Sequence, residues 1–127
     1  MSALDHVGIL VHDIDKSVEF YKATLGTVGI DLLMDFSHDG KRHAGFGVGQ
    51  NPFFWLSGTT KTTGGNHVAF TARSRAEVDA FYSVAMSMGA RDNGKPGLRP
   101  HYHANYYGAF VFDLDGNNIE AVCHAGE

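Results

Sequence analysis

The sequence predicts an α+β fold built from two tandem βαβββ modules that together form a cupped mixed sheet. One observation is an internal repeat: HVGILVHDIDKSVEFY (residues 6–21) aligns with HVAFTARSRAEVDAFY (residues 67–82). Both segments open with His-Val and close with Phe-Tyr, and 14 residues separate the His from the Phe in each. The other observation is that three strand-like runs, separated by turns, follow each segment.

Each repeated segment begins with a strand pattern and continues with a helical one. Val7, Ile9 and Val11 alternate with their neighbours, as Val68 and Phe70 do, and such alternation is typical of a half-buried strand. The apolar spacing then changes to the i, i+4, i+7, i+11 pattern of one buried helical stripe. The two stripes are Ile14, Val18, Tyr21 and Leu25, and Val78, Phe81, Ala85 and Met88.

Capping residues mark the ends of both helices. Asp13 is expected to cap the N-terminus of the first helix and Gly26 to stop it. Ser74 and Glu77 have the spacing of a capping box, and Gly89 is expected to end the second helix.

The remaining strands complete each module. In the first, the Asp39-Gly40 pair predicts a turn after His38, and in the second Asp115-Gly116 predicts another. We expect one domain over residues 1–127, with module 1 at 1–58, a linker at 59–65 and module 2 at 66–127. The expected strands are Ile30–Ser37, Arg42–Val48, Phe53–Ser57, a short one near Arg91, Tyr107–Asp113 and Asn118–Cys123.

Composition excludes several function classes. A formal net charge of −4 over 127 residues gives neither the basic surface typical of nucleic-acid binding nor a polybasic membrane patch. The expected partner is therefore a small molecule. Cys123 is the only cysteine, so an intrachain disulfide is impossible and a reducing, cytoplasmic location is expected. The first ten residues resemble neither a signal peptide nor a membrane span.

Strand alternation places three polar side chains away from the packed aliphatic stripes. His6 and His67 occupy matching positions in the repeat, and Glu120 lies opposite Ile119 and Ala121 in the last strand. Two imidazoles and one carboxylate that converge would form a facial metal site with open coordination positions. A divalent cation would also offset the charge of a buried carboxylate. Each residue taken alone is more often a surface or satisfied core residue.

The chain resembles the vicinal oxygen chelate superfamily, which includes glyoxalase I, extradiol dioxygenases, methylmalonyl-CoA epimerase, and fosfomycin- and bleomycin-resistance proteins. The resemblance rests on LDHVGILVHDIDKSVEFYKATLG (Leu4–Gly26), NHVAF (Asn66–Phe70) and FDLDGNNIEAV (Phe112–Val122). It implies two paired βαβββ modules around one divalent metal ion (Fe2+, Mn2+, Zn2+ or Ni2+) with His6, His67 and Glu120 as ligands, and a homodimer.

The sequence departs from the glyoxalase I and epimerase pattern at one place. Those enzymes carry a fourth ligand, Glu or Gln, on the last strand of the first module, where this chain has Phe53-Phe54-Trp55. A His, His, Glu set remains, as the resemblance implies for extradiol dioxygenases and fosfomycin-resistance proteins. Phe53 and Trp55 share a strand face that would line either a substrate pocket or the ordinary core.

The segment GLRPHYHANYYG (residues 97–108) is a second candidate for specificity. Extradiol dioxygenases place a His before the glutamate ligand, and the resemblance implies His101 as the matching catalytic acid/base. Those enzymes also carry a Tyr where this chain has Phe110. Tyr102, His103 and Tyr107 are expected to contact substrate; alternatively, with Tyr106, they form an amphipathic loop over the cup.

Two functions from different classes follow. The first is a metal-dependent enzyme acting on a small oxygenated substrate, with lyase or isomerase chemistry or as an extradiol ring-cleaving dioxygenase. Glu120 would serve that enzyme both as ligand and as a catalytic residue. The alternative is a binding protein of the bleomycin-resistance kind, which sequesters a ligand without catalysis. Retention of the three candidate metal ligands favours the enzyme, because sequestering members need none.

Overall fold

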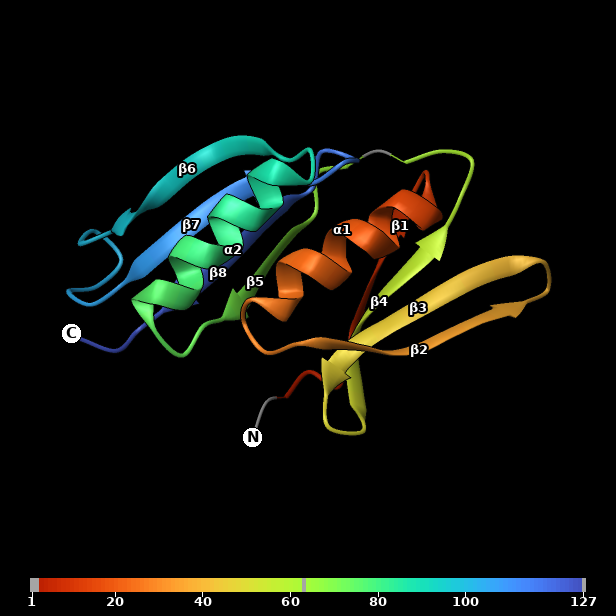
Figure 1. Cartoon of the computed structure of the whole chain (residues 1–127), viewed down its shortest axis with the longest axis horizontal. Helices are drawn as coiled ribbons and strands as arrows, with labels where there is room; N and C mark the ends of the chain where they lie inside the picture. Colours follow the sequence, from red (N-terminus) through yellow and green to blue (C-terminus); the bar gives the residue numbers. More distant parts are fainter. Residues whose placement is uncertain (1–2, 63, 127) are drawn as a thin grey trace.

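The computed structural model describes residues 3–62 and 64–126, and its two modules follow one another along the chain (Figure 1). The first module contains β1 (Val7–Val11), α1 (Ile14–Gly26), β2 (Asp31–His38), β3 (Lys41–Val48) and β4 (Asn51–Gly58). The second contains β5 (His67–Thr71), α2 (Arg75–Ser87), β6 (Arg91–Leu98), β7 (Tyr107–Phe112) and β8 (Asn118–Cys123). The predicted βαβββ-βαβββ order is confirmed.

Each module has its own four-stranded mixed sheet, and the two sheets have the same topology. The strand orders are β1-β4-β3-β2 and β5-β8-β7-β6. In each, the first strand pairs in parallel with the last, and the other pairs are antiparallel. The predicted mixed sheet is therefore divided into two halves that no strand pairing joins within the described part of the chain.

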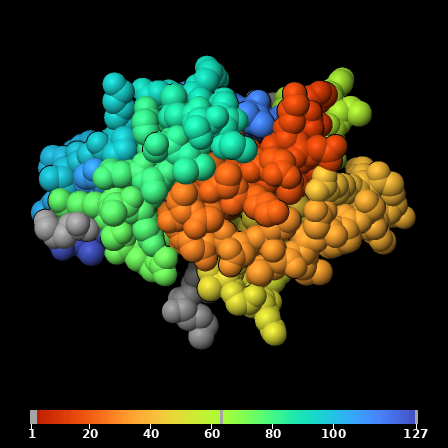
Figure 2. All heavy atoms as spheres, in the orientation of Figure 1, coloured from red at the N-terminus to blue at the C-terminus, as the bar shows by residue number. Residues whose placement is uncertain are grey.

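Both helices lie on the same side of the molecule and pack against one another, each covering one face of its own sheet (Figures 1 and 2). The buried residues of both modules form one core. Phe54 of β4 meets Phe70 of β5 edge to face, with ring centroids 5.0 Å apart, so aromatic packing crosses the module boundary. No helix of residues 3–62 and 64–126 covers the opposite face of either sheet.

The helix ends agree with the capping residues, with two corrections. Asp13 accepts a hydrogen bond from the backbone N–H of Lys16, and Ser74 accepts one from that of Glu77. The Glu77 carboxylate accepts a hydrogen bond from the backbone N–H of Arg73 rather than from that of Ser74. The second hydrogen bond of the capping box is therefore made to the residue before the N-cap. The predicted stop at Gly26 is one residue short, because Gly26 is still helical and Thr27 is the cap.

The second buried stripe and one strand length also need correction. Val78, Phe81 and Ala85 are buried, but Met88 is 36% exposed because it caps the helix and lies outside its last turn. The strand expected near Arg91 is eight residues long, since β6 pairs with β7 despite two glycines and a proline that mask its pattern. The Asp39-Gly40 turn is confirmed, with both residues at positive φ.

A buried polar network fixes the second module against the first. The Tyr21 hydroxyl of α1 donates to Asp113, which also accepts hydrogen bonds from the backbone and side-chain N–H groups of Asn117. Thr62 in the predicted linker donates to Asp115 in the same turn. The linker residue 63 lies outside the described residues. Neither helix of the described segments has the length and apolar character needed to cross a membrane.

Candidate active site

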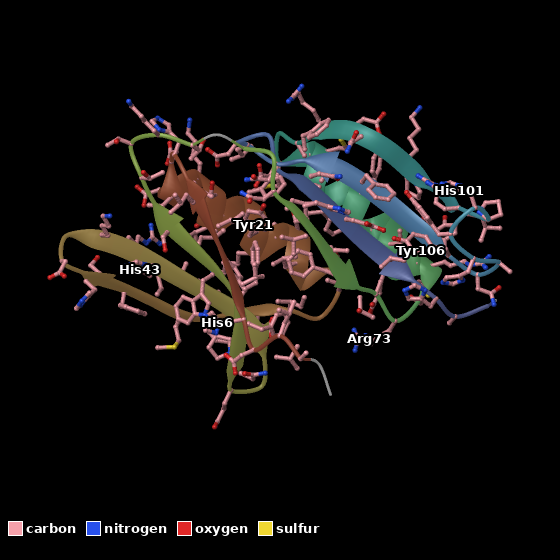
Figure 3. The ribbon with its side chains drawn as sticks, turned by 180° about the vertical axis from the view of Figure 1, so that it is seen from behind. His6, Tyr21, His43, Arg73, His101 and Tyr106 are labelled. Carbon is pink, nitrogen blue, oxygen red and sulfur yellow. The ribbon has the colours of Figure 1, made fainter. Side chains whose placement is uncertain are left out.

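The helix-free faces of the two sheets carry the chemistry-bearing side chains. We call the first the module-1 face, formed by His6, Gly8, Phe36, His43, Gly45, Trp55 and Ser57. We call the second the module-2 face, formed by His67, Ala69, Tyr106, Phe110 and Glu120. In Figure 3, which views the molecule from behind the helices, His6 and His43 lie on the first module and Tyr106 on the second.

Glu120 lies at the centre of the module-2 face. It pairs with Ala69 on β5 and with Phe110 on β7, and it is only 1% exposed. Gly108 makes room chiefly for the Tyr106 ring, because a Cβ atom there would lie 3.1 Å from Tyr106 Cε1 and 3.4 Å from the Glu120 Oε2 atom. A carboxylate at this depth is costly unless polar partners surround it.

Two side chains hold the Glu120 carboxylate. The Nε2 atom of His67 lies 3.0 Å from Oε1, and the Tyr106 hydroxyl donates to Oε2. Burial, followed by the hydrogen bond to Glu120 and the negative charge of that carboxylate, raises the pKa of Tyr106 above its ordinary value. Tyr106 therefore remains a neutral donor at physiological pH.

Tyr106 is the functional candidate that sequence reasoning assigned only to a packing loop. It precedes β7 and shares its parity with Gly108 and Phe110, so extending the alternation of β7 by two residues would have placed it beside Glu120. The many His and Tyr residues around Tyr106 obscured this alternation in the sequence.

His6 lies on the other module, away from this pair. Its Nδ1 atom is 2.6 Å from the Asp5 carboxylate, and its side chain is 58% exposed. Alternation does place it on the helix-free face, since Ile9 and Val11 are buried on the opposite one. One chain therefore brings His67 and Glu120 together but does not bring His6 to them.

Trp55 occupies the position of the missing fourth ligand. It pairs with Gly8 in β1, two residues after His6, just as Glu120 pairs with Ala69, two residues after His67. Trp55 and Glu120 therefore occupy equivalent positions in the two modules, one with an indole and the other with a carboxylate. Phe53, two residues earlier, is half-buried and lines a cleft of about 610 Å³ between the modules.

The other sequence-predicted residues lie around the β6–β7 loop. His101 is exposed and its ring lies 4.3 Å from that of Tyr102. His103 pairs with His124 near the C-terminus, ring on ring at 4.7 Å. Tyr107 turns to the helix side, where its hydroxyl donates to Asp79 of α2. Of this set, Tyr102 and His103 approach Glu120 only through Tyr106, whose ring they contact.

Two of the candidate donors fit a divalent ion, and the third lies apart from them. Across residues 3–62 and 64–126, no three or more His, Cys, Asp or Glu side chains are grouped in a way that could hold a metal. His67 and Glu120 nevertheless direct donor atoms at one point, 3.0 Å apart. Neighbouring ligands about 2.1 Å from one ion are about 3 Å apart, so this pair fits. His6 is not part of this pair within the chain.

Comparison with protein families and solved structures extends over almost the whole chain. The model of the Glyoxalase/Bleomycin resistance protein/Dioxygenase superfamily matches residues 3–121. A crystal structure of a glyoxalase/bleomycin resistance protein from Albidiferax ferrireducens T118 is 26% identical, with a TM-score of 0.79 over 96% of this chain and 99% of that chain. No curated protein sequence gives a significant match.

More distant structures share the fold alone. A glyoxylase/bleomycin resistance protein/dioxygenase domain from Frankia sp. EAN1pec is 17% identical, with a TM-score of 0.72 over 97% of this chain and 98% of that chain. Glyoxalase I from Zea mays is 20% identical, with a TM-score of 0.73 over 94% of this chain but only 45% of its own. The family model, matching most of the sequence, shows that this chain belongs to the glyoxalase/bleomycin resistance protein/dioxygenase superfamily.

Proposed function

We propose that this protein is a divalent-metal-dependent enzyme that acts on a small oxygenated molecule with lyase or isomerase chemistry. One observation carries the proposal: Glu120 is 1% exposed, and the side chains that hold it are an imidazole and a phenol rather than a lysine or arginine. A carboxylate buried in this way gains most from a cation bound beside it.

His67 and Glu120 would hold that ion together with the partner subunit's His6. The split of the donors between two modules of one chain supports a homodimer in which the module-1 face of one copy meets the module-2 face of the other. When bound, a divalent ion supplies Lewis-acid polarisation of a substrate oxygen.

Tyr106 supports lyase or isomerase chemistry over ring cleavage. Its hydroxyl keeps its proton at neutral pH and lies against the Glu120 Oε2 atom, where it can orient the carboxylate and donate a proton to substrate. His101, expected as the acid/base of a dioxygenase, is exposed beside Tyr102 instead, and Phe110 offers no hydroxyl.

Metal binding tests the proposal first. Isothermal titration of EDTA-treated protein with Mn2+, Ni2+ and Zn2+ should give about one ion per chain, because the ligand set is used once per chain. The His67→Ala/Glu120→Ala double variant should lose this binding, while Glu19→Gln, on the exposed side of α1, should keep it. Unchanged stoichiometry and affinity in the double variant would refute the site.

Turnover tests the reaction class. Small α-hydroxycarbonyl compounds incubated with metal-loaded protein in D2O should exchange their carbon-bound proton, as followed by NMR, and Glu120→Gln should abolish the exchange. Oxygen uptake by the Fe(II) form with a panel of catechols would assign ring cleavage instead.

The alternative, a binding protein without catalysis, is favoured by one feature of the same site. The Glu120 oxygens already have His67 and Tyr106 as partners, which a metal-free site would require. Under this alternative the protein would bind its ligand equally well in EDTA and would show neither proton exchange nor oxygen uptake.

A further inference from the structure

The module-1 face contains an aromatic pocket, and of its lining the metal-site proposal uses only His6. The pocket lies over two cross-strand rows of the sheet. Gly8, Trp55, Gly45 and Met34 make the first row, and Leu10, Ser57, His43 and Phe36 make the second. The pocket is open, has a volume of about 460 Å³ and includes His6 in its lining.

Gly45 lets the Trp55 indole lie flat across the sheet. A Cβ atom on Gly45 would come within 2.8–2.9 Å of three atoms of the indole ring, so only glycine leaves space for it there. A Cβ on Gly8 would contact the Trp55 Cβ atom at 3.8 Å on the other side. The indole therefore forms a floor whose position is fixed by the backbone beneath it.

Phe36 forms a wall at nearly a right angle to this floor. Its ring centroid lies 6.0 Å from that of Trp55 with an interplanar angle of 76°, and the residue is 43% exposed. A floor and a perpendicular wall offer a flat ring both an offset-stacked and an edge-to-face contact, the two geometries that aromatic pairs prefer.

The polar edge of the pocket identifies the substituent. The Nδ1 atom of His43 lies 2.8 Å from the Ser57 Oγ atom, and the His43 ring stands 5.5 Å from Phe36. The other residues of the lining are His6, Gly8 and His38, and the carboxylates of Asp5 and Asp39 lie behind the two histidines, at 2.6 Å from His6 and 3.4 Å from His38. Such an edge suits a hydroxyl group better than a carboxylate.

We propose that the module-1 face binds an uncharged planar aromatic molecule that bears a hydroxyl group, with its ring on Trp55 and against Phe36 and its hydroxyl at the His43–Ser57 pair. The inference that this molecule is a substrate rests on the proposed function, because its ring would then lie opposite the metal donors of a second copy. Binding itself needs no metal and is testable without one.

The single tryptophan of the chain provides the readout. In EDTA, the one indole cross-peak of the 15N-labelled protein should shift saturably on titration with 2-naphthol. Decahydro-2-naphthol, which has the same skeleton without a planar ring, should bind at least about tenfold more weakly, as should 2-naphthoate, which carries a charge. Equal affinity for either analogue, or no shift with 2-naphthol, would overturn the proposal.

Variants test the wall and the floor of the aromatic pocket separately. Phe36→Leu should weaken 2-naphthol binding about 3- to 10-fold. Gly45→Ala should weaken it by displacing the indole, and Met86→Ala on the exposed side of α2 is the matched control. Glu120→Gln should lose metal binding but retain 2-naphthol, so failure of the metal site and failure of the aromatic site give different results. An unchanged affinity in both Phe36→Leu and Gly45→Ala would contradict the pocket.

Discussion

Trp55 and Glu120 occupy the same place in two copies of one module, yet their surroundings differ at every neighbour. Trp55 lies between two glycines, Gly8 and Gly45, whereas Glu120 lies between Ala69 and Phe110. Gly45 makes room for a large flat ring. The carboxylate is instead held by two polar side chains from the same module.

The two copies of the module share one kind of core but present two different surfaces. The helix-covered faces of both sheets remain apolar and share one core, so the fold is conserved between the copies. The helix-free faces contribute little to that core, and substitutions there change chemistry without changing topology. One face offers donors for a cation, and the other offers an aromatic pocket.

Replacing the indole by a carboxylate should have the largest effect on this difference. Trp55→Glu would place an acid on each module, and we expect metal to bind about 10- to 100-fold more tightly because ligand charge increases. Binding of 2-naphthol should be lost at the same time. Titration of the variant with Mn2+ and with 2-naphthol measures both, and Trp55→Gln separates charge from shape. An unchanged metal affinity would show that the two positions are not equivalent.

Removing the hydroxyl that orients Glu120 should have an intermediate effect. Tyr106→Phe keeps the ring but leaves the Oε2 atom without its donor, so metal affinity should fall about tenfold, as for other groups that orient a ligand. Tyr102→Phe, in the same loop but exposed, is the control. If both variants bind metal like the wild type, Tyr106 has only a packing role.

We expect the smallest effect at one of the buried contacts between the two modules, the hydrogen bond from Tyr21 to Asp113. Burial, and then the nearby Asp113 charge, raises the pKa of Tyr21 well above its ordinary value. Its stabilising contribution is therefore complete below the unfolded pKa of about 10 and declines as the pH rises further, because only the unfolded chain releases the proton. Tyr21→Phe should cost about 1 kcal/mol at neutral pH.

The pH dependence of unfolding measures that contribution. In urea unfolding between pH 8 and 11, the free energy of unfolding of Tyr21→Phe should fall less steeply above pH 10 than that of the wild type. Met86→Ala, which removes no titratable group from an exposed position of α2, should follow the wild-type slope. Parallel curves for Tyr21→Phe and the wild type would mean that the buried hydroxyl does not couple folding to protonation.

The sequence predicted the fold because local patterns and the internal repeat agree. Alternation around Ile9 and Ile119, and the cap residues Asp13 and Ser74, place most elements within a residue or two. The length of β6 could not be predicted, because Gly94, Pro96 and Gly97 conceal a strand that pairing with β7 stabilises.

The alternation of side chains along the strands predicted only part of the site. Parity gives the face of His6, His67 and Glu120, but it cannot say whether one chain brings all three side chains within reach of one ion, and within the described residues it does not. It also could not place the loop residues: His101 stacks on Tyr102, and Tyr107 turns to α2. These positions depend on tertiary contacts, which produce no periodic pattern in the sequence.

Mixing two inactive variants tests the central claim most directly. His6→Ala and Glu120→Ala each remove one donor from every site, and neither variant alone should retain metal after desalting. If the donors come from different copies, random exchange of subunits restores one site in half of the dimers, or about one ion per four chains. Metal analysis of the mixture should give this value. No metal above that of the separate variants would contradict a site shared between two module faces.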